Sequence, residues 1–298
     1  METNKIKTTT GEKIFNVFNI AFMIAMMFVM FYPMWHVLCA SFSDARLLSA
    51  HTGILIWPDG YSVTAYKLMM KNPMILKGYG NTLFILVFGL LINMLMTCLA
   101  AYVLSRKNVM LNRPITIFIV FTMYFSGGLI PTYLNIKDLQ LLDTLWAVII
   151  PGAISTYNMI VLRTGFASVP ESLEESAKID GASAMRILWQ IILPLSKATV
   201  AVICLYYAVA HWNSWFNAML YLNDRELFPL QLILREILIQ NDTSSMVTAM
   251  DVGAGDSSFV SETVKYAVII VSVVPILCVY PFIQKYFTKG VMVGAVKG

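Results

Sequence analysis

Charged residues are scarce in this sequence. Asp, Glu, Lys and Arg make up only 13% of its 298 residues, about half of the roughly 25% that is usual in soluble domains. Hydrophobic residues make up 58%, and the mean hydropathy is +0.71. Such a composition excludes an ordinary water-soluble domain and indicates that lipid surrounds much of the chain.

Metal-binding and nucleotide-binding signatures are also absent. The four cysteines lie in or beside apolar runs, with no CxxC pair and no histidine at ligand spacing, so we expect neither a disulfide framework nor a metal site. No GxxxxGK[ST] phosphate loop occurs, so we expect no ATP or other cofactor on this chain. The basic residues are scattered without interleaved aromatics, which gives no indication of nucleic-acid binding.

Long stretches without any charge are what the sequence does contain. A membrane-spanning helix needs roughly 20 mostly apolar residues, and six stretches qualify: Ile14–Ser43, Gly78–Ser105, Pro114–Ile136, Thr144–Leu162, Ala198–Asn223 and Tyr266–Gln284. The first is too long for the apolar core of a signal peptide, and we interpret it as a retained span. The sequence therefore predicts an all-α integral membrane protein with six transmembrane helices.

The distribution of Lys and Arg predicts the orientation. With the N-terminus inside, thirteen of the 21 lie on inner segments and eight on outer ones, so the positive-inside rule puts both termini in the cytoplasm. We expect a cytoplasmic N-terminus (1–13), a transmembrane domain (14–287) and a cytoplasmic tail (288–298). The long outer loops would be 44–77, with a turn at Trp57–Gly60, and 224–265. In the latter, 227–240 is an interfacial helix or a re-entrant segment, and 241–261 is a loop.

One charged segment, at about 170–182, lies between two apolar stretches on the predicted cytoplasmic side. Pro170 and the acids after it predict the start of a helix, Ser172 and Glu175 have capping-box spacing, and Gly181 predicts its end. A second helix, 184–193, would lead to Pro194 and the fifth span. The residues are compatible with a solvated interfacial loop, or with a rigid helix through which a soluble motor moves the membrane part.

The spacing of this segment resembles a known signature. Glu175-Ser176-Ala177, three residues, Gly181, nine residues and Ile191-x-Leu193-Pro194 are similar to the EAA motif of permease subunits in ABC importers. Ser176 replaces the first alanine of that motif. Pro170–Ala182 as a whole, and the ending Gly290–Gly298, resemble the carbohydrate-uptake branch. Three further segments resemble the second permease of oligosaccharide importers: Asn81–Leu83, Gly127–Tyr133 and His211–Asn217.

The resemblance implies a non-catalytic subunit in a bacterial cell membrane. A sister permease would complete the pathway, two cytoplasmic ATPase subunits would carry ATP and Mg, and an extracytoplasmic solute-binding protein would deliver a sugar. The coupling residues carried over are Glu171, Glu174, Glu175, Ser176, Ala177, Asp180 and Gly181. Glu175 would anchor the segment in an ATPase cleft, with Ala177 and Gly181 allowing close packing. The tail 291–298 could also contact the ATPase.

Sugar contacts are predicted from polar and aromatic residues in the apolar stretches, because such residues tend to face a cavity or another helix. The candidates are Asn81, Asn93, Tyr124, Ser126, Tyr157, Asn158, Trp212, Asn213 and Asn217. Three alternatives remain: an ABC permease for another solute, an ion-coupled secondary transporter, or a membrane enzyme. The six stretches contain no Asp or Glu, which disfavours ion coupling, and no HExxH or GxSxG motif supports an enzyme. The sequence leaves the identity and charge of the sugar open.

Overall fold

The computed structural model describes residues 9–239 and 257–295, and this part of the chain is helical, with a single isolated bridge between Ser43 and Tyr61. The chain divides into two compact units. Unit 1 comprises 1–71 and 243–271, and unit 2 comprises 72–242 and 272–298. The last helix, α16 (Ser257–Ala295), contributes to both.

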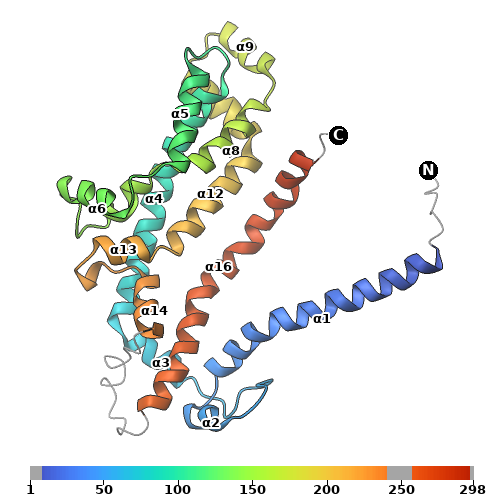
Figure 1. Cartoon of the computed structure of the whole chain (residues 1–298), viewed down its shortest axis with the longest axis vertical. Helices are drawn as coiled ribbons and strands as arrows, with labels where there is room; N and C mark the ends of the chain where they lie inside the picture. The colour runs from blue at the N-terminus through green and yellow to red at the C-terminus, as the bar shows by residue number, and fades with distance from the viewer. Residues whose placement is uncertain (1–8, 240–256, 296–298) are drawn as a thin grey trace. The chain divides into compact units, whose positions relative to one another are not determined.

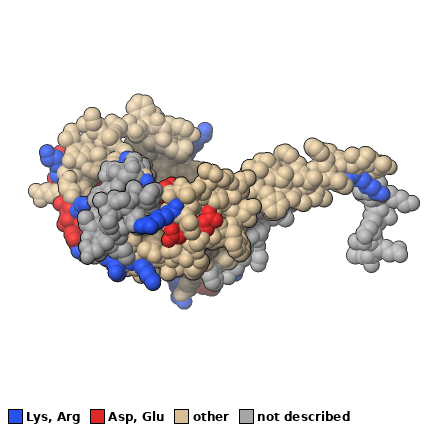
Figure 2. All heavy atoms as spheres, turned by 90° about the horizontal axis from the view of Figure 1, so that it is seen from below, with Lys and Arg blue, Asp and Glu red and all other residues tan. Residues whose placement is uncertain are grey.

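Unit 1 contains the first predicted span, which forms α1 (Thr10–Ser41). Thr9 and Glu12 form a capping box at its start, which satisfies amide groups that a helix N-terminus leaves unpaired. Apart from Glu12 and Lys13 the helix carries no charge, and most of its surface is uncharged in Figure 2. None of its most apolar 18-residue window is buried within the chain, as a helix covered by lipid or by another subunit requires.

The predicted outer loop 44–77 is mostly helical. It contains α2 (Ala45–Ala50) and α3 (Thr64–Lys71), and its last residues belong to α4, which begins at Pro73. The turn predicted at Trp57–Gly60 is present, with φ +61° at Gly60. The backbone amide of Asp44 donates to the Asp59 and Gly60 carbonyls at 2.8 and 2.7 Å, so the turn is fastened to the end of α1.

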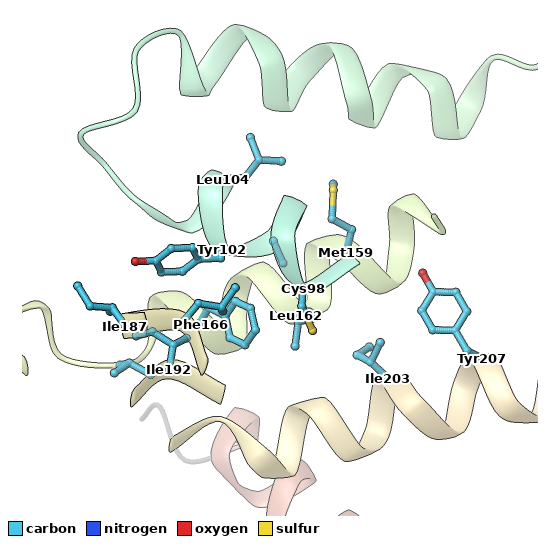
Figure 3. Close-up of a cluster of buried hydrophobic side chains, with 13 residues drawn as sticks. Cys98, Tyr102, Leu104, Met159, Leu162, Phe166, Ile187, Ile192, Ile203 and Tyr207 are labelled. Carbon is cyan, nitrogen blue, oxygen red and sulfur yellow. The ribbon is translucent and has the colours of Figure 1, made fainter. Parts of the chain in front are cut away.

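Unit 2 is built around α4 (Pro73–Ser105), α8 (Thr156–Ala167) and α12 (Lys197–Trp212), which pack against one another. In Figure 1 α8 lies in the half of the unit that carries α5 (Asn112–Tyr124). The buried side chains of α4, α8 and α12 meet in one cluster (Figure 3). Cys98 and Tyr102 come from α4, Leu162 and Phe166 from α8, and Ile203 from α12. The apolar spans thus bury one side against each other.

Among the described residues, three helices are long and apolar enough to cross a membrane, and three bent helix pairs are so when each pair is taken together. In the first pair, α5 (Asn112–Tyr124) and α6 (Leu129–Asp138) are bent by 109°. In the second, Leu145–Gly152, which contains α7 (Trp146–Ile149) and η1 (Ile150–Gly152), is bent by 49° from α8. In the third, Ala184–Leu195 is bent by 90° from α12. Six spans result only if each pair counts as one. The third predicted stretch is therefore not one straight helix. It breaks before Gly128, whose φ of +91° favours glycine.

Four other predicted segments have different boundaries in the structure. The fifth stretch ends as α12 at Trp212, where the Asn213 side-chain amide donates to the Val209 carbonyl at 2.9 Å, and α13 (Phe216–Tyr221) follows separately. After η3 (Arg225–Leu227), the segment at 227–240 forms α14 (Leu230–Ile239), in which Leu230, Leu232, Ile233, Leu234 and Ile237 are buried. Of the predicted loop 241–261, residues 257–261 belong to α16 and the others lie outside the described residues. Residues 288–295 of the predicted tail are helical, and 296–298 are not described.

Candidate functional site

The predicted charged helix is present as α9 (Glu171–Ile179). Figure 1 shows it at one end of unit 2, with α13 and α14 toward the other end. Pro170 occupies the N-cap, and no side chain caps the helix. The predicted capping box of Ser172 and Glu175 does not form, because Ser172 lies inside the first turn instead of before it. Glu171 and Glu174 lie in that turn, where negative charge is favourable to the helix dipole.

The C-terminus of α9 is a Schellman motif around Gly181. The Ala182 amide donates to the Ala177 carbonyl at 2.9 Å, and the Gly181 amide donates to the Lys178 carbonyl at 3.0 Å. Gly181 has φ +78°, and an added Cβ would meet no atom within 4 Å. Glycine is therefore required by the backbone and not by packing inside this chain. Ala177 and Ala182 both pack against the buried cluster of unit 2.

Glu174 faces the interior of the chain. It is only 5% exposed and accepts hydrogen bonds from Arg106 Nη1 at 2.6 Å and from the Tyr102 hydroxyl at 3.4 Å. Lys178 Nζ lies 3.0 Å from Glu174 Oε1. Sequence reasoning placed Glu174 among the residues that contact a partner, whereas the structure gives it an internal role: it fastens α9 to the end of α4.

Arg106 was missed by the sequence analysis. Besides binding Glu174, it donates from Nη2 to the Phe166 carbonyl of α8 at 3.0 Å, and its Cζ lies 5.1 Å from the centre of the Tyr102 ring. This one guanidinium therefore joins α4, α8 and α9. Its position directly after an uncharged stretch was visible in the sequence, but its partner, 68 residues away, was not.

The opposite side of α9 is exposed. Glu175, Ser176 and Asp180 are accessible, and two apolar side chains, Leu173 at 44% and Ile179 at 86%, are uncovered. The exposed side of α9 therefore carries both apolar and charged groups. Glu171 also lies at the surface, where it pairs with Lys107 at 3.0 Å.

A bent segment connects α9 to α12. It consists of α10 (Ala184–Ile187), the π-helix η2 (Leu188–Ile192) and α11 (Leu193–Leu195), so the predicted helix 184–193 exists with a π-helical turn inside it. Ile187 and Ile192 point into the buried cluster beside Phe166 and Tyr102 (Figure 3). The chain then turns by 90° into α12. The Arg106 contacts before α9 and the bent segment after it therefore hold α9 at the ends of α4, α8 and α12.

Four of the predicted sugar contacts are engaged inside the chain. Asn93 donates to the Gly152 carbonyl at 2.6 Å, and its Oδ1 lies 2.5 Å from His211 Nε2. Asn81 donates to the carbonyls of Glu226 and Phe228 at 2.8 and 3.1 Å. Trp212 Nε1 donates to the Ser272 carbonyl at 3.3 Å, and Asn158 is buried. Asn81, Asn93 and Trp212 therefore hydrogen-bond to other segments of this chain, and contact of any of the four with a sugar stays a prediction.

The other five predicted contacts are accessible within this chain: Tyr124, Ser126, Tyr157, Asn213 and Asn217. They lie on different elements, and the structure does not gather them into a single pocket. Sequence reasoning missed a second buried polar group, in which the Tyr207 hydroxyl lies 2.7 Å from Thr97 Oγ1 and accepts from the Ser155 amide at 2.9 Å. It fixes the break before α8 against α4 and α12.

Charges surround α13 and α14 at the other end of unit 2. Arg225 pairs with Glu236 at 2.7 Å, and Lys77 pairs with Glu226. Arg235 instead lies with its Cζ 4.7 Å from the centre of the Trp215 ring. No group of three or more His, Cys, Asp or Glu side chains suited to a metal ion occurs in the described residues.

Comparisons with known proteins place this chain among transport proteins. A family described as binding-protein-dependent transport system inner membrane component matches residues 101–293. The polygalacturonan/rhamnogalacturonan transport system permease protein YtcP of Bacillus subtilis is 41% identical, covering 96% of this chain and 99% of YtcP. Protein LplC of Bacillus subtilis is 39% identical, covering 100% of this chain and 99% of LplC. A crystal structure of a bacterial ABC transporter involved in import of the acidic polysaccharide alginate contains a chain with a TM-score of 0.86 and 30% identity, covering 95% of this chain and 100% of that one.

Proposed function

The chain belongs to the binding-protein-dependent transport system inner membrane component family, and on this premise we propose that it forms half of the membrane pathway of an ATP-driven oligosaccharide importer. The chain is a membrane permease component and not itself an enzyme. The observation that carries the proposal is α9, a short helix with one side fastened to the spans and the other side exposed.

The partners follow from the family, which implies an ABC importer. A sister permease completes the pathway, two cytoplasmic ATPase subunits hold ATP and Mg, and an extracytoplasmic solute-binding protein delivers the sugar. This chain binds no cofactor of its own. Both termini and α9 lie on the cytoplasmic side, a placement supported by the positive-inside rule and by the basic residues that the structure gathers beside α9, among them Arg106, Lys107 and Lys178.

The mechanism starts at the exposed side of α9. Leu173, Ile179 and Glu175 seat in a cleft of one ATPase subunit, which moves when ATP closes the ATPase pair. The helix must contact the two ATPase states with different free energies, because a ligand that binds both states equally shifts no equilibrium. Movement then reaches α4 through Glu174 and Arg106.

A second path for this movement is covalent. It runs through Gly181 and the bent segment 184–195 into α12, whose angle to that segment is 90°. Because α4, α8 and α12 share one buried cluster, they move as a unit. The result is a switch between inward-facing and outward-facing states of the pathway.

The cargo is an oligosaccharide, because the similar proteins include a polygalacturonan/rhamnogalacturonan permease and a chain of an alginate importer. Its contacts in this chain come from accessible aromatic, hydroxyl and amide side chains, which stack on and hydrogen-bond to sugars. Tyr124, Ser126, Tyr157, Asn213 and Asn217 serve this role. Asn81, Asn93 and Trp212 support them by holding segments of the chain together.

Transport by the reconstituted complex tests this function. The complex of this chain with its sister permease and ATPase subunits is placed in lipid vesicles, with ATP on the ATPase side and sugar-loaded binding protein on the other. We expect labelled oligosaccharide to accumulate only when ATP and the binding protein are both present. Uptake that is independent of ATP but follows an ion gradient would instead support a secondary transporter.

A further inference from the structure

Arg235 is a charged residue in an otherwise largely apolar helix. It lies on α14 beside Leu232, Ile233, Leu234 and Ile237, all of which are buried. A cation in such a setting is costly unless a negative group or water balances it. Over the described residues, Arg235 forms no ion pair, and the contact the structure gives it is with the Trp215 ring.

Neighbouring charges are already paired. Glu236, the next residue on α14, binds Arg225 at 2.7 Å, and Glu226 binds Lys77. Within the described part of the chain, Arg235 is therefore a positive charge without a carboxylate partner, beside two cations that have one. Its half-buried side chain leaves an accessible edge for an outside anion.

The Trp215 ring orients this charge. The guanidinium Cζ lies over the ring, 4.7 Å from its centre, a contact that attracts a cation to the face of an indole. The five N–H donors of a guanidinium lie in its own plane and match a carboxylate with two parallel hydrogen bonds. A ring contact on the face of the cation leaves these donors free. Trp215 itself is 38% exposed and adjoins the exposed Asn213 and Asn217, so sugar-binding groups lie close to the charge in the chain.

From this geometry we propose that the transported oligosaccharide carries carboxylates, as uronic-acid sugars do, and that Arg235, oriented by Trp215, selects it by binding a carboxylate. The proposal rests on the proposed function and adds the chemical class of the cargo. It makes Arg235 a specificity-determining residue.

Matched pairs of sugars test it. Galacturonate and mannuronate trisaccharides, together with the methyl esters of the same trisaccharides, differ in charge while keeping the sugar backbone. Uptake of each is measured with the reconstituted complex and its binding protein, and the acid-to-ester ratio of rates is taken for wild type, Arg235→Met and Arg235→Lys. We expect wild type to favour the acid, and Arg235→Met to lower the ratio about tenfold or more, as loss of a charge-assisted bidentate contact implies. Arg235→Lys should retain part of the preference.

Two controls separate selection from general effects. Lys67→Gln removes a positive charge from α3 in unit 1 and should leave the ratio unchanged. Trp215→Phe keeps an aromatic face for the guanidinium and should keep most of the preference, whereas Trp215→Leu should lose it. The affinity of the isolated binding protein for each acid and ester is measured in parallel. The acid-to-ester ratio of uptake rates is then divided by the same ratio of affinities.

Failure of the two proposals would look different. If ATP-driven uptake is seen but wild type and Arg235→Met share the same acid-to-ester ratio, the selecting role of Arg235 is wrong. That role is equally contradicted if Arg235→Met and Arg235→Lys both prevent the subunits from co-purifying, because the anion opposite Arg235 would then belong to a partner subunit. If neither member of any pair is taken up in an ATP-dependent manner, the oligosaccharide-import function itself fails.

Discussion

Single residues in this chain divide sharply into those that fasten helices and those left open to partners. Glu174 and Glu175 are neighbours in sequence, yet Glu174 is buried in an ion pair and Glu175 is exposed. The difference arises because Glu174 lies on the side of α9 that faces α4. Acidic residues of the same segment therefore have different roles, which variants can separate.

Breaking the buried pair should destabilise the complex and weaken coupling. The side chains of Arg106 and Glu174 are only 13% and 7% exposed, and removing one partner of a buried pair costs about 3–5 kcal/mol. We expect Glu174→Gln to lower the temperature at which the purified complex unfolds and to reduce sugar imported per ATP hydrolysed. Glu171→Gln is the matched control, because its pair with Lys107 is exposed and should change stability by at most about 1 kcal/mol. Equal effects of the two variants would contradict the role given to Glu174.

We expect the contribution of Asp143 to the stability of the fold to depend on pH. Its Oδ1 accepts from the amides of Asn223 and Asp224 at 2.8 and 2.9 Å, and these backbone hydrogen bonds lower the pKa of the carboxyl from 3.8. A carboxyl whose pKa is lower in the folded state than in the unfolded state stabilises the fold at pH values above its ordinary pKa. This stabilisation is lost as the pH falls through the lowered pKa. Asp143→Ala should therefore reduce thermal stability at neutral pH.

The same variant should differ progressively less from wild type as the pH falls below about 3.8. Unfolding temperatures measured across this range would check the sign, with Asp138→Ala, a nearby exposed acid at the end of α6, as the control. A difference that grows toward low pH would contradict this account of the carboxylate.

Helices form the next scale, and here α9 is the element that we propose contacts an ATPase subunit. Its exposed side carries Leu173, Glu175 and Ile179, while its other side is fixed through Glu174. In a chain with Cys278 replaced by Ser, to remove the exposed native cysteine, Ile179→Cys should form a cross-link to an ATPase subunit carrying cysteines around its cleft. Glu174→Cys, at a buried position, should not. A co-purifying complex in which no exposed position of α9 cross-links would exclude it as the coupling helix.

Close approach of α4 and α12 is a second property of the elements. A Cβ added at Gly89 of α4 would lie 2.6 Å from His211 Nε2 of α12, and the ring, held by Asn93, has little freedom to withdraw. Gly89→Ala should therefore destabilise the complex by about 1–3 kcal/mol, as overpacking does. Gly80→Ala, on the same helix with nothing within 4 Å, should be neutral or slightly stabilising. Thermal unfolding of the two purified variants makes the comparison.

The sequence predicted what depends on local chemistry. Pro170, the acids after it and Gly181 are sufficient to place α9 and its end, because caps and positive φ are properties of a few adjacent residues. It failed where distant segments meet. The inward direction of Glu174 depends on Arg106, and the burial of α14 depends on α4. The uncharged stretches likewise could not indicate that a span bends, since lipid tolerates a bent pair as well as a straight helix when other helices satisfy the backbone.

At the scale of the whole molecule, the proposed function makes the chain a link between an ATPase subunit and a membrane pathway. Family membership over residues 101–293 removes the membrane enzyme from the alternatives and leaves the cargo as the open question. One end of unit 2 carries α9, and the other carries the charged region of α13 and α14 (Figure 1). The helices α4, α8 and α12 share one buried cluster, so we expect movement at α9 to reach all three.

The central claim is that α9 couples ATP hydrolysis to sugar uptake, and substitution of Gly181 tests this claim most directly. ATP hydrolysis and oligosaccharide uptake should be measured together in the reconstituted complex, for wild type, Gly181→Trp and Gly80→Ala. Because Gly181 has φ +78°, a bulky residue there strains the connection from α9 to the bent segment. We predict that Gly181→Trp assembles but imports little sugar per ATP hydrolysed, while Gly80→Ala matches wild type. If Gly181→Trp imports as much sugar per ATP as wild type, α9 does not drive this permease.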